Sequence, residues 1–367
     1  MKAALLTGIR KIEIRDVPRP DICSSQDVLI KIGRAGICGT DVHYYLHGHS
    51  GNQIIEYPWV VGHECAGVVE KVGDQVTRVT QGDRVTVDPA VSCGNCDQCR
   101  AGYRHTCRNL RFLGFPGQMG GCLCESIVMP EENCYKIDGK LSLAQGVLVE
   151  PLSIGIYAFD FIKKLSAKTI GVLGCGPIGL SVMLAALAEG IRLIYATDKI
   201  AERLAAARKN GAVWTGNPVQ ADIVTGILKH AGELDAIFEC CGDQEALDQA
   251  INLLKPGGNL LILGIPEIDR VSFDVHKLRR KEISIQNIRR QNRCTQRAID
   301  LIASQKVDVD FMATHTFALE ETQQAFELVA GYGDGVLKAT VQSGLIPLKL
   351  EAVGKFDQED IVGMDGE

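Results

Sequence analysis

Hydrophobic and polar positions alternate in two different ways along this chain. Up to about residue 153, short β-branched runs such as residues 28–32, 67–72 and 83–87 are separated by Gly, Pro and Asp. Short strands closely spaced by turn residues predict a mainly β domain. From about residue 168, apolar strands alternate with helical stretches, which predicts a doubly wound parallel sheet.

The elements of the second region have recognisable ends. We predict strands at residues 169–173, 193–197, 235–239, 260–263 and 283–288, and helices at residues 178–189, 201–209 and 245–254. Asn210-Gly211 ends the second helix and Pro256-Gly-Gly stops the third. Helices at 295–304 and 320–330, a strand at 338–341 and an acidic tail complete the chain.

Residues 169–188 have the length and the lack of charge of a membrane-spanning helix, because they carry no charge for twenty positions. Four glycines and Pro177 interrupt the first half of this stretch, and a strand–turn–helix explains them better. The first ten residues lack the apolar stretch of a signal peptide. We therefore expect a cytoplasmic protein without a membrane partner.

Length and composition fit an ordinary soluble globular protein. The 367 residues suggest two or three domains, and 46% hydrophobic residues are enough for large cores. Thirty-nine basic against forty-five acidic residues give a net charge of −6. A generic binder of nucleic acids or anionic membranes needs a basic face, so neither partner is expected.

A glycine fingerprint lies between the first predicted strand and helix of the parallel region. The run GCGPIG from Gly174 to Gly179 matches G-x-G-x-x-G. The first glycine permits a tight turn, the second lets a pyrophosphate approach the backbone, and the third lets helix pack on strand. The phosphates would bind the free N–H groups at the helix start. The expected dinucleotide site therefore includes Gly174, Gly176, Pro177, Ile178 and Gly179.

Asp198 ends the next predicted strand, nineteen residues after Gly179. A carboxylate there accepts hydrogen bonds from an adenosine ribose diol and repels a 2′-phosphate, which favours NAD over NADP. Alternatively, Asp198 merely caps the helix that begins near Ile200. Arg203 either flanks the adenosine or belongs to a solvated helix face, and Lys199 leaves room for NADP.

Four of the fourteen cysteines follow the spacing C-x2-C-x2-C-x7-C, at Cys93, Cys96, Cys99 and Cys107. Four thiolates close a tetrahedron around Zn²⁺ and leave no open position, so we expect a structural zinc. An iron–sulfur cluster and free thiols are the alternatives. Arginines at 100, 104, 108 and 111 suggest a nucleic-acid zinc ribbon, which the acidic charge of the chain disfavours.

A second group of metal-ligand residues is more widely spaced. Cys38 and His63 are suited to zinc, and a carboxylate or water would complete an open catalytic site. Glu150, at the expected domain junction, is a candidate third acid. A lone Cys and a lone His are more often core residues, so the spacing by itself leaves both interpretations open.

Several separated motifs together resemble a zinc-dependent medium-chain dehydrogenase over residues 1–345. They are the GHE-x2-G-x5-G run from Gly62 to Gly73, the four-cysteine lobe, the glycine fingerprint, and the CGTDVH run from Cys38 to His43. Within that superfamily, the continuation to Tyr44 and Tyr45 and the run Glu150-Pro-Leu-Ser resemble the sorbitol (polyol) dehydrogenase branch. Simple alcohol dehydrogenases have a cysteine in place of Glu150.

The resemblance implies an α/β architecture with a GroES-like, mainly β catalytic domain made from both ends of the chain. The first segment would comprise residues 1–153, with the zinc lobe at 93–107. A doubly wound Rossmann domain for NAD would occupy residues 154–290. The chain would return to the catalytic domain at 291–346 and finish in the acidic tail, 347–367. Relatives form dimers or tetramers, so a homo-oligomer is expected by analogy.

The resemblance also assigns roles at the site. Cys38, His63 and Glu64 would hold the catalytic zinc, and Glu150 would bind it directly or hydrogen-bond its water. Thr40 and His43 match a relay that carries the released proton outward, although His43 alone would read as a surface histidine. After the strand at 260–263, the expected cofactor-binding set is completed by Leu263, Gly264 and Ile265.

The substrate implied is a small hydroxylated molecule, whose secondary hydroxyl passes a hydride to NAD with zinc as the Lewis acid. The polyol branch would place Tyr44, Glu150 and Arg290 around it. Residues 289–293 depart from the arginine–aromatic pattern usual there, so Arg290 could instead lie at the surface. A cyclitol, a sugar phosphate or threonine is an alternative substrate, and a non-catalytic zinc- and nucleotide-binding protein is an alternative function.

Overall fold

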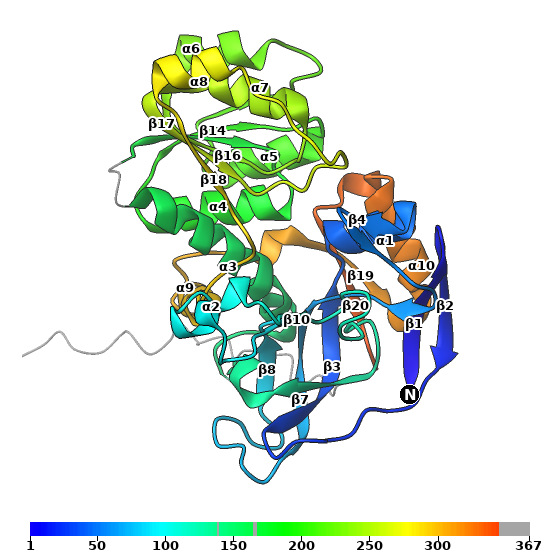
Figure 1. Ribbon diagram of the computed structural model, residues 1–367. Helices are drawn as coiled ribbons and strands as arrows, with labels where there is room; N and C mark the ends of the chain where they lie inside the picture. The colour runs from blue at the N-terminus through cyan, green and yellow to red at the C-terminus, as the bar shows by residue number, and fades with distance from the viewer. Residues whose placement is uncertain (138, 164–166, 345–367) are drawn as a thin grey trace, which may run out of the picture.

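The computed structural model describes residues 1–137, 139–163 and 167–344, so the predicted tail at 347–367 lies outside the described residues. It contains a mainly antiparallel β part and a parallel α/β part, as the two patterns of the sequence predict (Figure 1). The mixed α/β fold class is thereby confirmed.

The β part is built around a seven-stranded sheet in the order β12-β8-β7-β3-β20-β19, with β11 also paired to β3. Its elements before residue 137 are β1 (Lys2–Gly8), β2 (Lys11–Asp16), β3 (Asp27–Gly36), α1 (Gly39–His47), β4 (His49–Ser50), β5 (Gln53–Ile54), β6 (Trp59–Val60), β7 (Glu64–Val72), β8 (Arg84–Val87), β9 (Ala90–Val91), α2 (Asp97–Arg100), η1 (Arg104–Thr106), β10 (Arg111–Phe112), β11 (Ser126–Pro130), η2 (Glu131–Asn133) and β12 (Cys134–Lys136).

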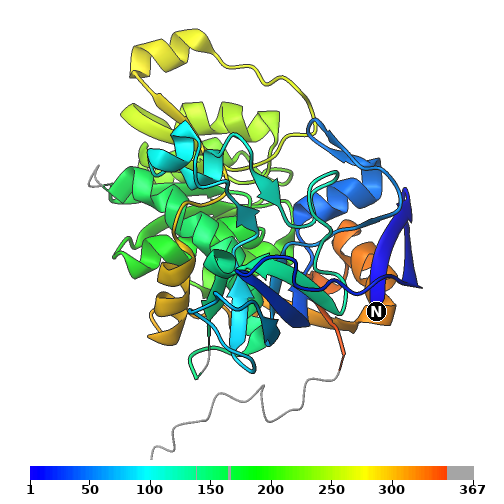
Figure 2. The ribbon, with the colours of Figure 1, turned by 60° about the horizontal axis from the view of Figure 1, so that its bottom comes forward.

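The end of the described chain returns to this sheet. Its elements are α9 (Thr295–Ala303), η3 (Asp310–Met312), β19 (Ala313–Ala318), η4 (Leu319–Glu321), α10 (Thr322–Ala330), η5 (Gly333–Gly335) and β20 (Lys338–Gln342). Strand β20 pairs antiparallel with β3, with Thr340 opposite Gly36. In Figures 1 and 2 the orange C-terminal elements accordingly lie beside the blue N-terminal ones.

The α/β part is a six-stranded parallel sheet in the order β15-β14-β13-β16-β17-β18. It consists of β13 (Thr169–Leu173), α4 (Pro177–Ala188), β14 (Leu193–Thr197), α5 (Ala201–Lys209), β15 (Trp214–Gly216), α6 (Ile223–Ala231), β16 (Leu234–Glu239), α7 (Gln244–Leu253), β17 (Leu254–Ile262), α8 (Val275–Lys281) and β18 (Ser284–Asn287). The chain leaves β13 toward one side of the sheet and later returns to its other side. The carboxyl ends of β13 and β16 therefore flank the switch point where open α/β sheets bind ligands.

Residues 169–188 form strand β13, a turn and helix α4, which confirms the strand–turn–helix prediction. The strand predicted at 260–263 is wrong at its start, because β17 begins at Leu254, directly after α7. Leu234 pairs with Leu254 and Ala236 with Asn259, so the Pro256-Gly-Gly segment is accommodated as an irregularity inside the strand. The sequence patterns also missed β15, α6 and α8.

The longest helix, α3 (Leu143–Lys163), was not predicted, and position 153 lies in its middle. Pro151, which normally interrupts a helix, lies inside it. A β-carbon added at Gly146 would lie 2.8 Å from the Ala66 Cβ, and one at Gly155 would lie 2.4 Å from the Ser181 carbonyl carbon. These two glycines let α3 pack closely on β7 and on α4, so one helix joins the two parts.

Helix α3 also has, among the described residues, the length and apolar composition of a membrane span. Within the protein, 72% of its most apolar window is buried. Burial in the core accounts for the apolar character of this helix.

Candidate active site

Strand pairing brings the predicted open-site residues together. Strand β7 pairs antiparallel with β3, with Glu64 opposite Gly36, so His63 and Cys38 extend from adjacent strand ends. The side-chain ligand atoms of Cys38, His63 and Glu64 lie within 4.8 Å of one another. A thiol, an imidazole and a carboxylate are donors that zinc accepts, and three protein ligands leave a position open. The residues present therefore fit a catalytic zinc.

Asp41 holds this group in place and was not singled out by the sequence analysis. Its carboxylate, 1% exposed, accepts hydrogen bonds from the backbone N–H of Cys38 at 3.0 Å and of Gly62 at 3.1 Å. The same carboxylate lies 3.6 Å from His63 Nδ1. A carboxylate facing the second nitrogen of a ligand histidine orients the ring. Its capping position in the first turn of α1 was the available signal.

Lys338 is a second residue that sequence reasoning missed. Its ammonium donates hydrogen bonds to both Glu64 carboxylate oxygens, at 2.6 and 2.7 Å. The Lys338 and Glu64 side chains are 2% and 1% exposed, so the pair is fully buried. The residues lie 274 positions apart, and only the return of β20 beside β3 brings them together.

Glu150, on α3, is buried beside this group but outside the set of ligand atoms that converge within 4.8 Å. Burial raises the pKa of Glu150 to about 7, with neighbouring Glu64 raising it and His63 and Lys338 lowering it. The structure therefore places Glu150 near the open site and Glu64 directly in it.

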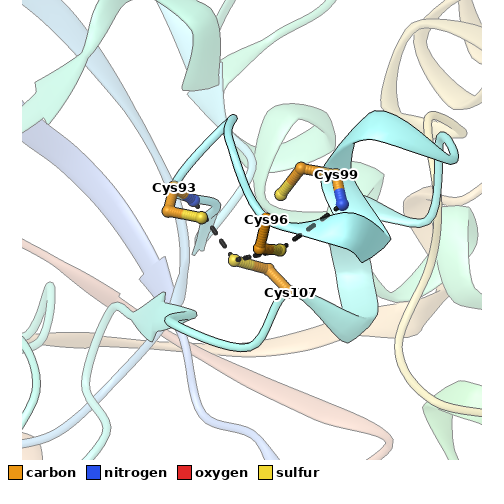
Figure 3. A group of neighbouring side chains, drawn as sticks. All are labelled: Cys93, Cys96, Cys99 and Cys107. Atoms are coloured by element: carbon orange, nitrogen blue, oxygen red, sulfur yellow. Dashed lines mark hydrogen bonds between the residues drawn. The ribbon is translucent and has the colours of Figure 1, made fainter.

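The four-cysteine lobe forms a closed site, with all four thiols within 4.8 Å of one another (Figure 3). The Sγ atoms of Cys96 and Cys107 are 3.9 Å apart. A regular tetrahedron with Zn–S bonds of ~2.3 Å has edges of ~3.8 Å, so the spacing fits zinc. Backbone N–H groups point at the sulfurs, from Cys93 to Cys107 at 3.2 Å and from Cys99 to Cys96 at 3.5 Å.

The arginines of the lobe do not form a free basic face. Arg108 donates two hydrogen bonds to the Asp97 carboxylate, at 2.5 and 2.7 Å, and Arg104 pairs with Glu132 at 2.5 Å. Two of the four arginines that suggested nucleic-acid binding are therefore paired with acidic side chains of the protein at its surface.

Arg290 is half-buried, and its Nη1 atom is fully buried. Its guanidinium carbon lies 3.6 Å from the centre of the Phe112 ring and 5.2 Å from that of Phe115. The aromatic partners that residues 289–293 lack thus come from the segment after the cysteine lobe. Burial lowers the pKa of Arg290 to about 10, with neighbouring Arg289 acting in the same direction. Arg290 also has a positive φ of 54°, uncommon for a residue other than glycine.

Two buried polar atoms in this region have no hydrogen-bond partner among the described residues: Tyr44 Oη and Arg290 Nη1. Tyr44 is 1% exposed, its ring meets the Phe115 ring edge-on at 6.2 Å, and burial raises its pKa. Buried polar groups are nearly always hydrogen-bonded, so these two atoms are suited to a polar ligand. Tyr44 and Glu150 both act electrostatically on the pKa of Arg290, so the three predicted substrate residues lie near one another.

Thr40 and His43 occupy one face of α1, three residues apart. Both are half-buried, and His43 lines the large cleft described next. Burial lowers the pKa of His43, which favours the neutral imidazole. Among the described residues, no direct hydrogen bond joins the two side chains.

The glycine fingerprint borders a cleft of about 640 Å³ between the two parts. Gly174 has a φ of +97°, and a β-carbon at Gly179 would lie 1.9 Å from the Gly174 carbonyl oxygen. Gly176 precedes α4, which starts at Pro177 and continues through Ile178. The glycines therefore perform the turn and packing roles expected of them. Of the other predicted cofactor residues, those lining the cleft are Asp198, Arg203 and Ile265.

Asp198 is not the N-cap of α5, which is Ile200, but it braces the turns that follow β13 and β14. Its carboxylate accepts hydrogen bonds from the Ile200 N–H at 2.8 Å, ahead of α5, and from the Cys175 N–H at 2.7 Å. It thus ties the fingerprint turn to β14 while still lining the cleft. Arg203 lies 4.0 Å from Asp198 and 4.9 Å from the centre of the Tyr332 ring, and Lys199 pairs with Asp243 at 2.7 Å.

Leu263 and Gly264 are held through their backbone. Both N–H groups bond the Glu239 carbonyl, at 2.8 and 3.0 Å, which brings Ile265 to the cleft wall. The buried Glu239 carboxylate accepts hydrogen bonds from the N–H groups of Cys241 and Gly242, in the turn that follows β16. The sequence analysis missed this residue. Tyr332, from the C-terminal segment, also lines the cleft and was missed.

Comparison with known proteins gives matches along most of the chain. The family model of the alcohol dehydrogenase GroES-like domain matches residues 24–139, and that of the zinc-binding dehydrogenases matches residues 177–304. The chain is 36% identical to sorbitol dehydrogenase of Bacillus subtilis (strain 168) over 343 residues, 93% of this chain and 97% of that enzyme.

The chain is also 33% identical to L-idonate 5-dehydrogenase of Vitis vinifera over 349 residues, covering 91% of this chain and 93% of that protein. Among solved structures, a Sinorhizobium meliloti 1021 protein described as a zinc-binding dehydrogenase and bound to NADP superposes with a TM-score of 0.84. It shares 30% sequence identity, over 93% of this chain and 98% of that chain.

Proposed function

Because this chain belongs to the zinc-binding alcohol dehydrogenases with a GroES-like domain, we propose that it oxidises a secondary hydroxyl group of a polyol with NAD, giving a ketose and NADH. The family resemblance of the sequence motifs is confirmed by these matches. Sorbitol and L-idonate, the substrates in the names of the two relatives, are both hydroxyl-rich.

The observation that carries the polyol assignment is the pair of unpartnered buried atoms, Tyr44 Oη and Arg290 Nη1. A substrate with several hydroxyl groups would supply their hydrogen bonds. A simple alcohol would leave them unmade, and a site built to bond a hydroxyl rejects an analogue without it by a factor on the order of 10⁴. Glu150, whose pKa burial raises to about 7, adds a third polar group beside them.

Cys38, His63 and Glu64 would hold the catalytic zinc, and Cys93, Cys96, Cys99 and Cys107 the structural one. The catalytic ion, when bound, supplies Lewis-acid polarisation of the substrate hydroxyl. Asp41 orients the His63 ring, and Lys338 balances the charge of Glu64. Thr40 and His43 would carry the released proton from the site along α1 toward the cleft mouth, where His43 lies.

The large cleft would bind NAD. The pyrophosphate would approach Gly176 at the start of α4, and the Asp198 carboxylate would meet the adenosine ribose. A negative charge at Asp198 repels a 2′-phosphate. Arg203 lies between Asp198 and Tyr332, and Lys199 is paired with Asp243, so both cations already have partners in the protein other than a phosphate group.

A reducing, cytoplasmic setting is supported by the cysteines, since none of the fourteen is in a disulfide and five are placed to bind zinc. A homo-oligomer, dimer or tetramer, is proposed by analogy with the family. A small hydroxylated substrate is the partner that family membership supports.

The test is NADH formation with sorbitol, xylitol, an inositol, threonine and butan-2-ol, using the zinc-loaded protein. We expect the kcat/KM for sorbitol or xylitol to exceed that for butan-2-ol by a factor on the order of 10⁴. Tyr44→Phe removes one hydroxyl without changing the ring, and should narrow that ratio mainly by raising the KM for the polyol. Equal kcat/KM values for butan-2-ol and the polyols would contradict the polyol assignment. Absence of NADH formation with every alcohol would contradict the proposal that the protein is a dehydrogenase.

A further inference from the structure

Three metal-ligand side chains meet at the mouth of the cleft, away from both predicted zinc sites. They are His43 and His47, on α1, and Glu267, on the loop after β17. Their ligand atoms lie within 4.8 Å of one another, and His47 Nε2 is 3.8 Å from the Glu267 carboxylate. In Figures 1 and 2 the yellow loop after β17 approaches the blue α1–β4 region in both views.

The helix places the two imidazoles for joint coordination. Residues four apart lie one above the other on a helix face, and the His43 and His47 ring centres are 6.2 Å apart. The His49 ring lies a further 6.2 Å from that of His47. These side chains surround a small hollow of about 140 Å³, whose opposite wall is formed by Ile265, Pro266 and Glu267.

The donor set suits a transition metal. Two imidazoles and one carboxylate are ligands of zinc in proteins, and imidazole also favours copper and nickel. His43 is half-buried, and a neutral imidazole nitrogen offers the lone pair that a metal ion needs. His47 and Glu267 are 43% and 70% exposed, so their side chains can adjust to shorter metal–ligand distances. The exposure also predicts weaker, reversible binding than in the closed lobe.

We propose that His43, His47 and Glu267 form a third zinc site, which is inhibitory. A metal ion there would join α1 of the β part to the loop after β17 of the α/β part, across the cleft that His43, Ile265 and Glu267 line. It would occupy the lone pair with which His43 takes up a proton. This inhibitory consequence rests on the proposed dehydrogenase function, whereas metal binding itself does not.

The binding test is equilibrium dialysis of the zinc-loaded protein against excess Zn²⁺, followed by metal analysis. The wild type should bind one zinc ion more than His47→Ala and Glu267→Gln. His276→Ala, which removes an exposed histidine elsewhere, on α8, is the matched control and should retain the additional ion. Equal zinc content in wild type, His47→Ala and Glu267→Gln would overturn the site, whether or not the protein turns over any alcohol.

The inhibition test uses the same four proteins. Without added zinc, His47→Ala should oxidise the polyol at the wild-type rate, because His47 belongs neither to the proposed catalytic residues nor to the lining of the large cleft. Glu267 lines that cleft, so the zinc sensitivity of Glu267→Gln is measured relative to its own rate without added zinc. Half-inhibition of these variants should require roughly tenfold or more zinc than the wild type and His276→Ala need. A third zinc that binds without slowing turnover would refute the inhibitory role, and so would unchanged zinc sensitivity of both variants.

Discussion

Gly179 offers a sharp test of the cofactor site, because the space for a side chain there is known. A β-carbon at this position would lie 1.9 Å from the Gly174 carbonyl oxygen, where β-carbons essentially never approach within 3.0 Å. The Gly174 turn has little freedom to yield. Its N–H bonds the Thr197 carbonyl at 2.8 Å, and its φ of +97° is one that residues other than glycine rarely adopt. Gly179→Ala should therefore push the start of α4 outward by about 1 Å.

Overpacking of this kind costs about 1–3 kcal/mol. For a domain of this size the thermal midpoint should fall by roughly 3–9 °C. A displacement of about 1 Å in a group that positions a reactant costs on the order of 100-fold in rate, so kcat should fall by about that factor, and NADH should bind more weakly. The assays are differential scanning calorimetry, steady-state kinetics and a fluorescence titration with NADH.

Gly176→Ala is the matched comparison. A β-carbon there meets only the Arg203 guanidinium, at 3.5 Å, and the backbone φ of −67° suits any residue. The thermal midpoint should stay unchanged, while the added methyl group blocks the pyrophosphate and weakens NADH binding. Wild-type NADH binding by Gly179→Ala would refute the rigid turn, and wild-type binding by Gly176→Ala would refute the phosphate position.

Three further variants test the surrounding structure. In the metal-free protein, Lys338→Met leaves the Glu64 carboxylate buried without its cation and should destabilise the fold by about 3 kcal/mol. The thermal midpoint should fall, and Glu64→Gln in the same chain should restore it. Asp198→Ala leaves the Cys175 N–H without its acceptor and removes the negative charge that repels a 2′-phosphate. The KM for NAD should therefore rise, and the ratio of kcat/KM for NADP to that for NAD should increase. An unchanged ratio would contradict the proposed role of Asp198. Cys96→Ser should remove one zinc ion and lower turnover by loosening the Phe112 ring under Arg290, and full zinc content would contradict the closed site.

The sequence predicted what local patterns determine. Strands β13 and β14 match their predicted bounds, and the glycine fingerprint lies in the predicted turn, because turn chemistry and the alternation of strand and helix are local signals. Helix α3 was missed because Pro151 normally ends a helix, whereas here burial of fourteen of its residues stabilises it. The short strand β15 and the helix α8 gave too little pattern to be recognised, whereas helix α6 was missed although Asp222 caps its start and its apolar residues favour one face.

At the site, the sequence identified the residues that would bind zinc and substrate, but not the residues that fix the positions of their side chains. Cys38 and His63 belong to quoted motifs, whereas the Lys338–Glu64 pair depends on β20 returning beside β3. Arg290 was doubtful because its aromatic partners are absent from neighbouring positions. Phe112 and Phe115 reach it from the segment after the cysteine lobe, a contact that only tertiary packing creates.

The central claim is that an open zinc site at Cys38 and His63 performs the oxidation. The most direct measurement compares zinc content and polyol-dependent NADH formation of wild type, Cys38→Ser and the exposed-thiol control Cys23→Ser, after dialysis against a weak chelator. The account predicts two zinc ions per chain and full turnover in wild type and control, and one zinc ion with no turnover in Cys38→Ser. Two zinc ions and wild-type turnover in Cys38→Ser would contradict it.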